Sequence, residues 1–372
     1  MVRHGKAFRK YLGCFSLLFA LAACGEVGIN YPTLDFTSLI SRAKKEGQIV
    51  SVGMHDGWPT GQKIWDDLNL YYGLKDEDTD MGSEKILKCF RGDSDALVSS
   101  PDIGDIGLEY AREAKSQGLL AGYQTSYWDE IPTWAKDNSG QYIVSFTGTL
   151  AFLYDSAFGN EAPKSFADIA KGDYKVGVAS VASGSTGQFS VYAAALACGG
   201  GADNIEPGIA FFKQLAKQGR LVENLKTDNL PTSGYEDQIR VLISWDFSAL
   251  AYRDEAAARN PAKSYGACIP SDGSVTSGYA SIISKNAPHP YAAMLAREYL
   301  LSDAGQLDIA SFYATPIRSV KLPSELEDKR ISRDQYTSSQ TEMGAKFTLD
   351  LSKKIKKAWE TEVETEAPIR AQ

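Results

Sequence analysis

The sequence predicts an α/β fold with a largely parallel sheet, because strand-like apolar runs alternate with amphipathic helical patterns along the chain. The length of 372 residues is enough for two domains, and a composition of 43% hydrophobic and 23% charged residues is that of a folded protein. The longest strand-like run, Ile143 to Tyr154, is interrupted by Thr147-Gly148-Thr149. This run fits either two strands end to end or one strand that passes between two lobes.

The predicted elements of the first half follow one another in βα order. We expect a helix that ends at Gly47, a buried strand at residues 48–53, and a helix after the turn at residues 55–60. A second buried strand is expected at residues 103–107, with a helix beyond it. Between them, Asp76, Asp78 and Asp80 have the spacing of a calcium loop. Met81 and Leu87 occupy the positions of its glycine and glutamate, so a solvated acidic turn is predicted instead.

The second half continues the same alternation. Strands are predicted at residues 176–180, 241–245 and 279–284, and helices after residues 187, 205 and 290. Near the C-terminus an apolar residue recurs every four positions, at Met343, Phe347, Leu351, Ile355 and Trp359. This spacing predicts an amphipathic helix laid on the body, with the lysines at positions 353, 354, 356 and 357 on its solvated face.

The first 24 residues have the pattern of an export signal. A leader with Arg3, Lys6, Arg9 and Lys10 precedes an apolar stretch at residues 11–20, and Leu-Ala-Ala-Cys ends at Cys24. This ending resembles the lipobox of bacterial lipoproteins, which implies cleavage before Cys24 and a diacylglycerol on its sulfur. We therefore expect a signal peptide at residues 1–23 and a lipidated tether at residues 24–32. A plain signal peptide with an incidental cysteine is the alternative.

Several classes of function are disfavoured by composition. A formal net charge of −8 argues against nucleic acid as a partner, because phosphate binding needs a basic face. No apolar run reaches the ~18 residues of a membrane-spanning helix. Three histidines are too few for a conventional zinc site, and the sequence has no HExxH, GxSxG or P-loop motif. We therefore expect no enzyme, metal or cofactor.

Three cysteines remain in the body, at positions 89, 198 and 268. None has CxxC spacing, and we expect buried free thiols, with one disulfide as the alternative in an oxidising compartment.

Six short motifs between about residues 101 and 318 resemble, in the same order, segments of bacterial extracellular solute-binding proteins of ABC importers. They are PDIGDI at residues 101–106, APKSFADI at 162–169, GDYKVGV at 172–178, NAPHPYAA at 286–293, LLSDAGQ at 300–306 and TPIR at 315–318. The branch that they resemble contains binders of polyamines, ferric ion, thiamine, and phosphonates or sugar phosphates.

The resemblance implies a type II periplasmic-binding-protein fold, with two lobes joined by crossing strands and the ligand in the cleft between them. The first part of lobe 1 would span residues 33–147, lobe 2 residues 148–278, the return to lobe 1 residues 279–318, and a C-terminal helical segment residues 319–372. It also implies a monomeric protein of the cell envelope, on the periplasmic or extracytoplasmic face, that delivers a solute to ABC permease subunits. The lipid on Cys24 would hold it at the membrane.

Candidate ligand-binding residues follow predicted strands, because ligands collect at the carboxyl ends of parallel strands. His55, Asp56 and Trp58 follow the first strand, and Trp58 suits stacking on an organic cation or a place in a tight turn. Ser183, Ser185 and Thr186 precede a helix, whose N-terminus suits an anion or needs only a simple cap.

The remaining candidates lie in the second half of the chain. Trp245 and Asp246 follow the strand at residues 241–245, and Asp246 could pair with a ligand amine or cap a helix. Tyr279 and Tyr313 lie near the predicted hinge and could equally be core residues, and Glu109 and Tyr110 are weaker candidates.

These residues favour a small polar organic ligand with an amine, as in polyamine recognition, and a phosphate or phosphonate is compatible with the serine-rich turn. Ferric ion is a less favoured alternative, because the single Tyr-Tyr pair, Tyr71-Tyr72, lies in a predicted first-lobe helix. A lipid-anchored hydrolase that uses distant carboxylates is the alternative from another class.

Overall fold

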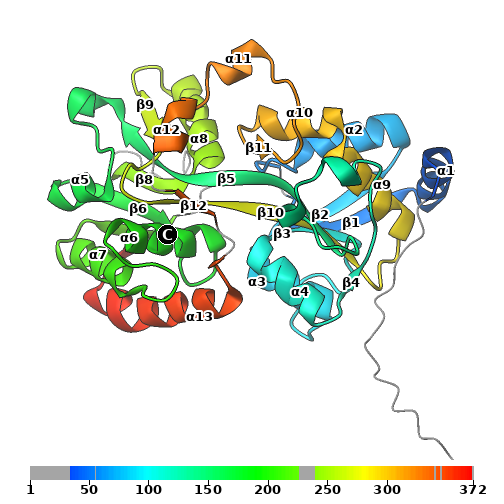
Figure 1. Cartoon of the computed structure of the whole chain (residues 1–372), viewed down its shortest axis with the longest axis horizontal. Helices are drawn as coiled ribbons and strands as arrows, with labels where there is room; N and C mark the ends of the chain where they lie inside the picture. Colours follow the sequence, from blue (N-terminus) through cyan, green and yellow to red (C-terminus); the bar gives the residue numbers. More distant parts are fainter. Residues whose placement is uncertain (1–33, 55, 226–238, 339–340, 344–345, 371–372) are drawn as a thin grey trace, which may run out of the picture.

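In the computed structural model, residues 34–54, 56–225, 239–338, 341–343 and 346–370 are described. Figure 1 shows two α/β lobes side by side, bridged by two long strands that run between them. The predicted signal peptide, the tether with Cys24, and His55 lie outside the described residues. Within the described ranges no helix is both long enough and apolar enough to cross a bilayer.

Lobe 1 is built on three parallel strands in the order β2-β1-β3, followed by β10. The strands are β1 (Gln48–Val52), β2 (Lys75–Thr79), β3 (Ile103–Gly107) and the short β4 (Leu120–Ala121). The helices are α1 (Phe36–Glu46), α2 (Gln62–Tyr72), α3 (Ser83–Arg91), α4 (Leu108–Ser116), α9 (Pro290–Leu301) and α10 (Asp303–Ser311), with 3₁₀ turns at Trp128–Glu130 and Thr133–Ala135. The prediction of a solvated acidic turn is therefore wrong. The segment forms the edge strand β2, because its pairing with β1 outweighs its polar sequence.

Lobe 2 repeats the arrangement in the order β7-β6-β8. Its strands are β6 (Lys175–Ala179), β7 (Leu221–Leu225), β8 (Ile239–Trp245), β9 (Tyr265–Cys268) and β13 (Ile369–Arg370). Its helices are α5 (Phe166–Lys171), α6 (Ser185–Ala197), α7 (Glu206–Lys217) and α8 (Asp246–Arg259), with a 3₁₀ segment at Ser156–Glu161.

Two strands belong to both lobes. β5 (Tyr142–Asp155) pairs with β10 (Ser274–Ser284) through Thr149 and with β8 from Leu150 onward. The prediction of one strand passing between two lobes is thus confirmed, and two strands end to end is wrong. Gly148 is required at this passage, because a Cβ there would lie 2.5 Å from the Phe247 ring. β10 begins five residues before the predicted strand because its polar first half is ordered by pairing with β5 rather than by apolar sequence.

The C-terminal segment packs mainly on lobe 2. It contains α11 (Ser324–Glu327), α12 (Arg333–Ser338), β12 (Thr341–Met343), α13 (Leu349–Ala358), a π-turn (Trp359–Val363) and a 3₁₀ turn (Glu364–Glu366), whereas the short β11 (Thr315–Pro316) ends the return segment and pairs with β5. The predicted long helix is shorter than expected: it begins at Leu349, where the Thr348 side chain caps its N-terminus, and Met343 lies in β12. The apolar spacing alone predicts one continuous helix from Met343, but the strand β12 and the Thr348 cap delay the start of the helix to Leu349.

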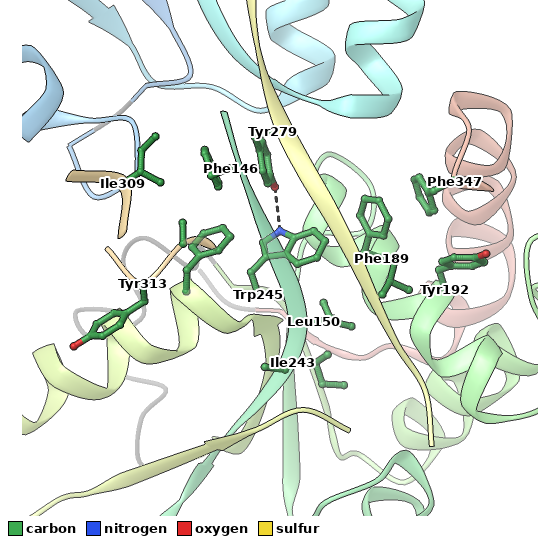
Figure 2. Close-up of a cluster of buried hydrophobic side chains, with 14 of the residues drawn as sticks. Phe146, Leu150, Phe189, Tyr192, Ile243, Trp245, Tyr279, Ile309, Tyr313 and Phe347 are labelled. Carbon is green, nitrogen blue, oxygen red and sulfur yellow. Dashed lines mark hydrogen bonds between the residues drawn. The ribbon is translucent and has the colours of Figure 1, made fainter. Parts of the chain in front are cut away.

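A buried aromatic cluster joins these parts. Figure 2 shows Phe189, Tyr192 and Phe347 together beside Trp245, and the rings of Phe189 and Phe347 stack with centroids 4.0 Å apart. Trp359 donates a hydrogen bond to Glu223, 2.9 Å away, which fixes the end of the segment on β7. The C-terminal segment is therefore part of the core of lobe 2 rather than an appendage.

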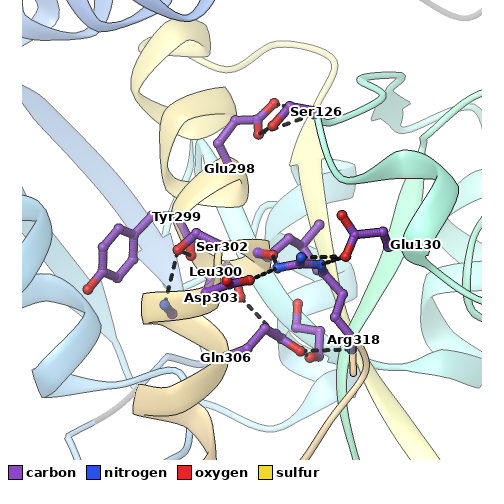
Figure 3. Close-up of polar contacts among 12 residues, drawn as sticks. Ser126, Glu130, Glu298, Tyr299, Leu300, Ser302, Asp303, Gln306 and Arg318 are labelled. Atoms are coloured by element: carbon purple, nitrogen blue, oxygen red, sulfur yellow. Dashed lines mark hydrogen bonds and ion pairs between the residues drawn. The ribbon is translucent and has the colours of Figure 1, made fainter. Parts of the chain in front are cut away.

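The return segment is tied to lobe 1 by polar contacts of the buried side chains Arg318 and Gln306 (Figure 3). The Arg318 guanidinium donates to Glu130, to Asp303 and to the Leu301 carbonyl. Gln306 donates to the Leu300 and Ser145 carbonyls at 2.8 and 3.0 Å. These contacts hold the junction of α9 and α10 against β5 and so fix the crossing strand below the cleft.

Cys89 and Cys268 are buried free thiols, as predicted. Cys198 is also free but exposed, so its predicted burial is wrong: it lies just beyond the last turn of α6, where the helix leaves the core.

Candidate functional site

A cleft of about 640 Å³ lies between the two lobes. Its walls come from the carboxyl ends of β1, β3 and β6, from the N-termini of α3 and α6, and from β10. The lining residues include Gly53, Trp58, Asp80, Ser83, Asp105, Ser183, Ser185, Thr186 and Tyr279. This position agrees with the expectation that parallel strands deliver ligand-binding residues at their carboxyl ends.

Asp105 is the central acidic group of this cleft. It lies within β3, is 4% exposed, and accepts hydrogen bonds through Oδ2 from Trp58 Nε1 at 2.8 Å and from the Thr60 hydroxyl at 3.1 Å. Its other oxygen, Oδ1, is buried with no hydrogen-bond partner in the described part of the protein. Burial raises the pKa of Asp105 to about 7, while the two donors act in the opposite direction. A buried carboxylate oxygen without a partner is a position that a ligand donor can fill.

Two aromatic side chains flank Asp105. Trp58 and Tyr279 meet edge to face with ring centroids 4.9 Å apart, and Trp58 also lies edge to face with Phe247 at 5.2 Å. The Tyr279 hydroxyl accepts a hydrogen bond from Trp245 Nε1 at 3.0 Å, and burial raises the pKa of Tyr279. Aromatic walls beside a carboxylate suit an organic cation.

Helix N-termini from both lobes enter the cleft. α3 begins at Ser83 after Gly82, α6 begins at Ser185 after Gly184, and neither helix has a side-chain cap. A Cβ at Gly82 would lie 3.2 Å from the Ser183 carbonyl oxygen, so the two helix starts approach each other across the cleft. This approach needs glycine or a similarly small residue on the lobe 1 side.

A second buried carboxylate, Glu109, contacts the start of α6. Glu109 lies in the first turn of α4, is 3% exposed, and accepts a hydrogen bond from the Ser185 hydroxyl at 2.7 Å. Burial raises the pKa of Glu109, and the Ser185 hydrogen bond lowers it. Because α4 belongs to lobe 1 and α6 to lobe 2, this contact joins the two lobes beside the cleft.

The rim of the cleft carries paired charges. Lys356 of α13 lies 3.6 Å from Glu84 of α3, and Lys88 lies 2.6 Å from Asp95. The prediction that Lys356 is only part of a solvated face is therefore wrong, because the rotation of α13 turns this lysine to the cleft wall. Helical spacing in the sequence cannot give that rotation.

Five of the predicted site residues come together in the cleft: Trp58, Ser183, Ser185, Thr186 and Tyr279. Asp56 is exposed in the turn after β1 and is not among the lining residues. Trp245 is buried below Tyr279, to which it donates. The Tyr313 hydroxyl contacts Asp254 of α8, outside the cleft wall.

Asp246 lies beneath the crossing strand rather than in the cleft wall. It is 1% exposed, accepts hydrogen bonds from the backbone N–H groups of Thr149 and Phe247 at 3.0 and 2.8 Å, and accepts one from the Tyr336 hydroxyl at 2.7 Å. Burial raises its pKa to about 6. Asp246 is thus the first residue of α8 and bonds the backbone of β5 and of its own first turn, whereas the N-cap residue of that helix is Trp245, so the helix cap that the sequence also allowed is not formed by Asp246.

Sequence reasoning missed Asp105 as a site residue, although it lies in the PDIGDI motif. No side-chain pattern marks it, because it stands in a short strand whose five residues are all buried. Among the described residues, no group of three or more His, Cys, Asp or Glu side chains is arranged to hold a metal ion.

The sequence model of the bacterial extracellular solute-binding proteins matches residues 96–335, more than half of the chain. This protein belongs to that family. A search of curated proteins finds no match. As a member of the family, the chain is the solute-binding component of an ABC import system, and the family acts outside the cytoplasm in binding rather than in catalysis.

Solved structures show the same type II periplasmic-binding-protein fold. The binding protein AfuA of Actinobacillus pleuropneumoniae, solved with fructose-6-phosphate, is 15% identical over 85% of this chain and 98% of its own, with a TM-score of 0.65. The spermidine/putrescine-binding protein PotD of Streptococcus pneumoniae is 15% identical over 86% and 99%, with a TM-score of 0.64. Iron-bound HitA of Pseudomonas aeruginosa is 15% identical over 83% and 99%, with a TM-score of 0.60. Their different ligands leave the solute of this solute-binding protein to be argued from its own cleft.

Proposed function

We propose that this solute-binding protein captures a small organic molecule with a cationic amine and delivers it to a membrane permease. The observation that carries the proposal is the unpartnered Oδ1 of Asp105 in the cleft wall. An ammonium group supplies both the donor and the positive charge that this oxygen lacks.

The surroundings of Asp105 support a cation over an anion. Asp105 and Glu109 are both buried, and neither forms an ion pair with a Lys, Arg or His side chain of the described residues. The edge-to-face rings of Trp58 and Tyr279 add apolar surface and a favourable electrostatic field for an organic cation. A volume of about 640 Å³ suits a small molecule rather than a bare metal ion.

The location of the cleft explains how binding would be reported to a permease. Asp105 and Trp58 belong to lobe 1, whereas Ser183 and Thr186 belong to lobe 2. A ligand that touches both walls binds the closed arrangement more tightly than an open one and so shifts the population toward closure.

The test is binding of putrescine, spermidine, thiamine, aminoethylphosphonate, fructose-6-phosphate and ferric citrate to the purified full chain. We expect an amine to raise the melting temperature. At a concentration of 100 times its Kd, the amine should add about 2.7 kcal/mol to the free energy of unfolding. Asp105→Asn should lower amine affinity at least about 30-fold, because one partner of a buried charge pair is lost. Asp56→Asn, an exposed carboxylate outside the cleft wall, is the matched control. Equal amine affinity of Asp105→Asn and the unmodified protein would exclude the proposal.

We also propose that the protein is a monomer held at the membrane by a lipid on Cys24. The Leu-Ala-Ala-Cys ending of the leader supports this anchoring. Cys24→Ser should release the protein from the membrane fraction and abolish incorporation of labelled fatty acid. Unchanged labelling in Cys24→Ser would contradict the assignment.

A further inference from the structure

The starts of α3 and α6 should attract an anion. In each helix the backbone N–H groups of the first two residues, Ser83 and Glu84 in α3 and Ser185 and Thr186 in α6, have no hydrogen-bond acceptor in the described part of the chain. Helix N-termini with free N–H groups bind phosphate and carboxylate groups. Both starts line the same cleft as the unpartnered oxygen of Asp105.

Glu109 already places an anionic group at one of them. Its Oε1 lies 2.7 Å from the Ser185 hydroxyl, and a Cβ at Gly107 would meet Oε1 at 2.8 Å, Oε2 at 3.1 Å and Ser185 Oγ at 3.1 Å. The carboxylate is therefore enclosed between the N-cap of α4 and the first residue of α6. It lies at the N-termini of two helices at once, a position that stabilises negative charge.

We infer that Glu109 is the specificity-determining residue that makes this cleft reject anionic ligands, by occupying the start of α6 with a carboxylate of the protein's own. This inference rests on the proposed amine function and deepens it. Asp105 attracts a cation through its unpartnered oxygen, and Glu109 repels phosphate, phosphonate and carboxylate groups from the start of α6. A site thus discriminates through a repulsive element as well as an attractive one.

Removing the charge of Glu109 should open the helix start to anions. Glu109→Gln keeps the side-chain length and an oxygen that accepts from Ser185, but it has no negative charge. We expect inorganic phosphate to bind Glu109→Gln roughly a hundredfold more tightly than the unmodified protein, because like-charge contacts in a desolvated site are strongly unfavourable. Glu109→Met, which leaves Ser185 without its acceptor, should show a gain in the same direction.

The control is Glu206→Gln. Glu206 is also a carboxylate in a first helical turn, that of α7, but it is exposed and is not among the residues that line the cleft. The phosphate affinity of this variant should stay within about threefold of that of the unmodified protein, since an exposed charge outside the cleft is screened by solvent and salt.

Calorimetric titration of inorganic phosphate and of spermidine into the full chain and the three variants separates the outcomes. A phosphate gain confined to the Glu109 variants supports the inference, whether or not spermidine binds. An amine-binding protein whose Glu109 variants gain no phosphate affinity overturns the inference and leaves the proposed function standing. Tight phosphate binding by the unmodified protein overturns the inference without any variant, and if no amine binds, the proposed function fails with it.

Discussion

Asp105→Asn should make the protein more stable and at the same time remove its affinity for amines. Burial holds the pKa of Asp105 at about 7, above the value of 3.8 for an unperturbed aspartate. The folded state therefore favours the protonated acid, so this group opposes folding increasingly as the pH rises from about 4 to about 7. Above pH 7 the opposition is about 4 kcal/mol, from the free energy that corresponds to this shift.

The asparagine variant has no charge to desolvate. Its Oδ1 can still accept from Trp58 and Thr60, and its amide takes the place of the unpartnered oxygen. Thermal unfolding at pH 8 should therefore show a higher melting temperature for Asp105→Asn than for the unmodified protein, with the difference shrinking toward pH 4.

The affinity for an amine should rise with pH, whereas the contribution of Asp105 to stability falls. An ammonium group binds the ionised carboxylate, so each pH unit below 7 should weaken amine affinity roughly tenfold. Glu109 contacts Ser185 of the cleft wall and Asp78 lies near Asp105, so Glu109→Gln serves to show which carboxylate titrates: this variant should keep the inflection near pH 7 that Asp105→Asn loses. A flat affinity profile between pH 5.5 and 8, or a lower melting temperature of Asp105→Asn at pH 8, would refute the reasoning.

Three further substitutions separate the cleft from its support. Asp246→Asn should leave amine affinity within about threefold while changing the melting temperature, because the hydrogen bonds of Asp246 are made beneath the cleft; a sharp loss of affinity in titration would instead return Asp246 to the binding site. Gly148→Ala should destabilise the protein by about 1–3 kcal/mol in denaturant unfolding, since a Cβ would lie 2.5 Å from Phe247, and an unchanged midpoint would contradict the packing. Lys356→Met should raise the ligand dissociation rate less than about threefold, because its pair with Glu84 is half-exposed; a tenfold increase in stopped-flow measurements would give the rim a larger role.

The alternation of strands and helices could be predicted from the sequence, because the local spacing of apolar residues indicates each buried strand and each buried helix face. The passage of β5 between the lobes was one of two possibilities, and only its two pairing partners, β8 and β10, decide it. β2 could not be predicted, since its residues Lys75–Thr79 are polar and become a strand only beside β1.

The sequence predicted the site residues that lie directly after the ends of strands. Trp58, Ser183 and Thr186 follow strands and reach the cleft. Trp245 and Asp246 also follow a strand, but Trp245 packs beneath Tyr279 and the Asp246 carboxylate is satisfied by the backbone of β5 and α8. Contacts between helices and strands decide which of the residues after a strand reach the cleft. A single sequence does not contain those contacts.

Asp105 and Glu109 together connect stability to function. Two buried carboxylates without a cationic partner among the described residues weaken the folded state, since desolvation disfavours the charge of each. Glu109 recovers part of this loss from Ser185 and from two helix N-termini, whereas Oδ1 of Asp105 recovers nothing within the described chain. The missing compensation is of the kind that an ammonium ligand supplies, so ligand binding should stabilise this protein most above pH 7, where the uncompensated charge is fully developed.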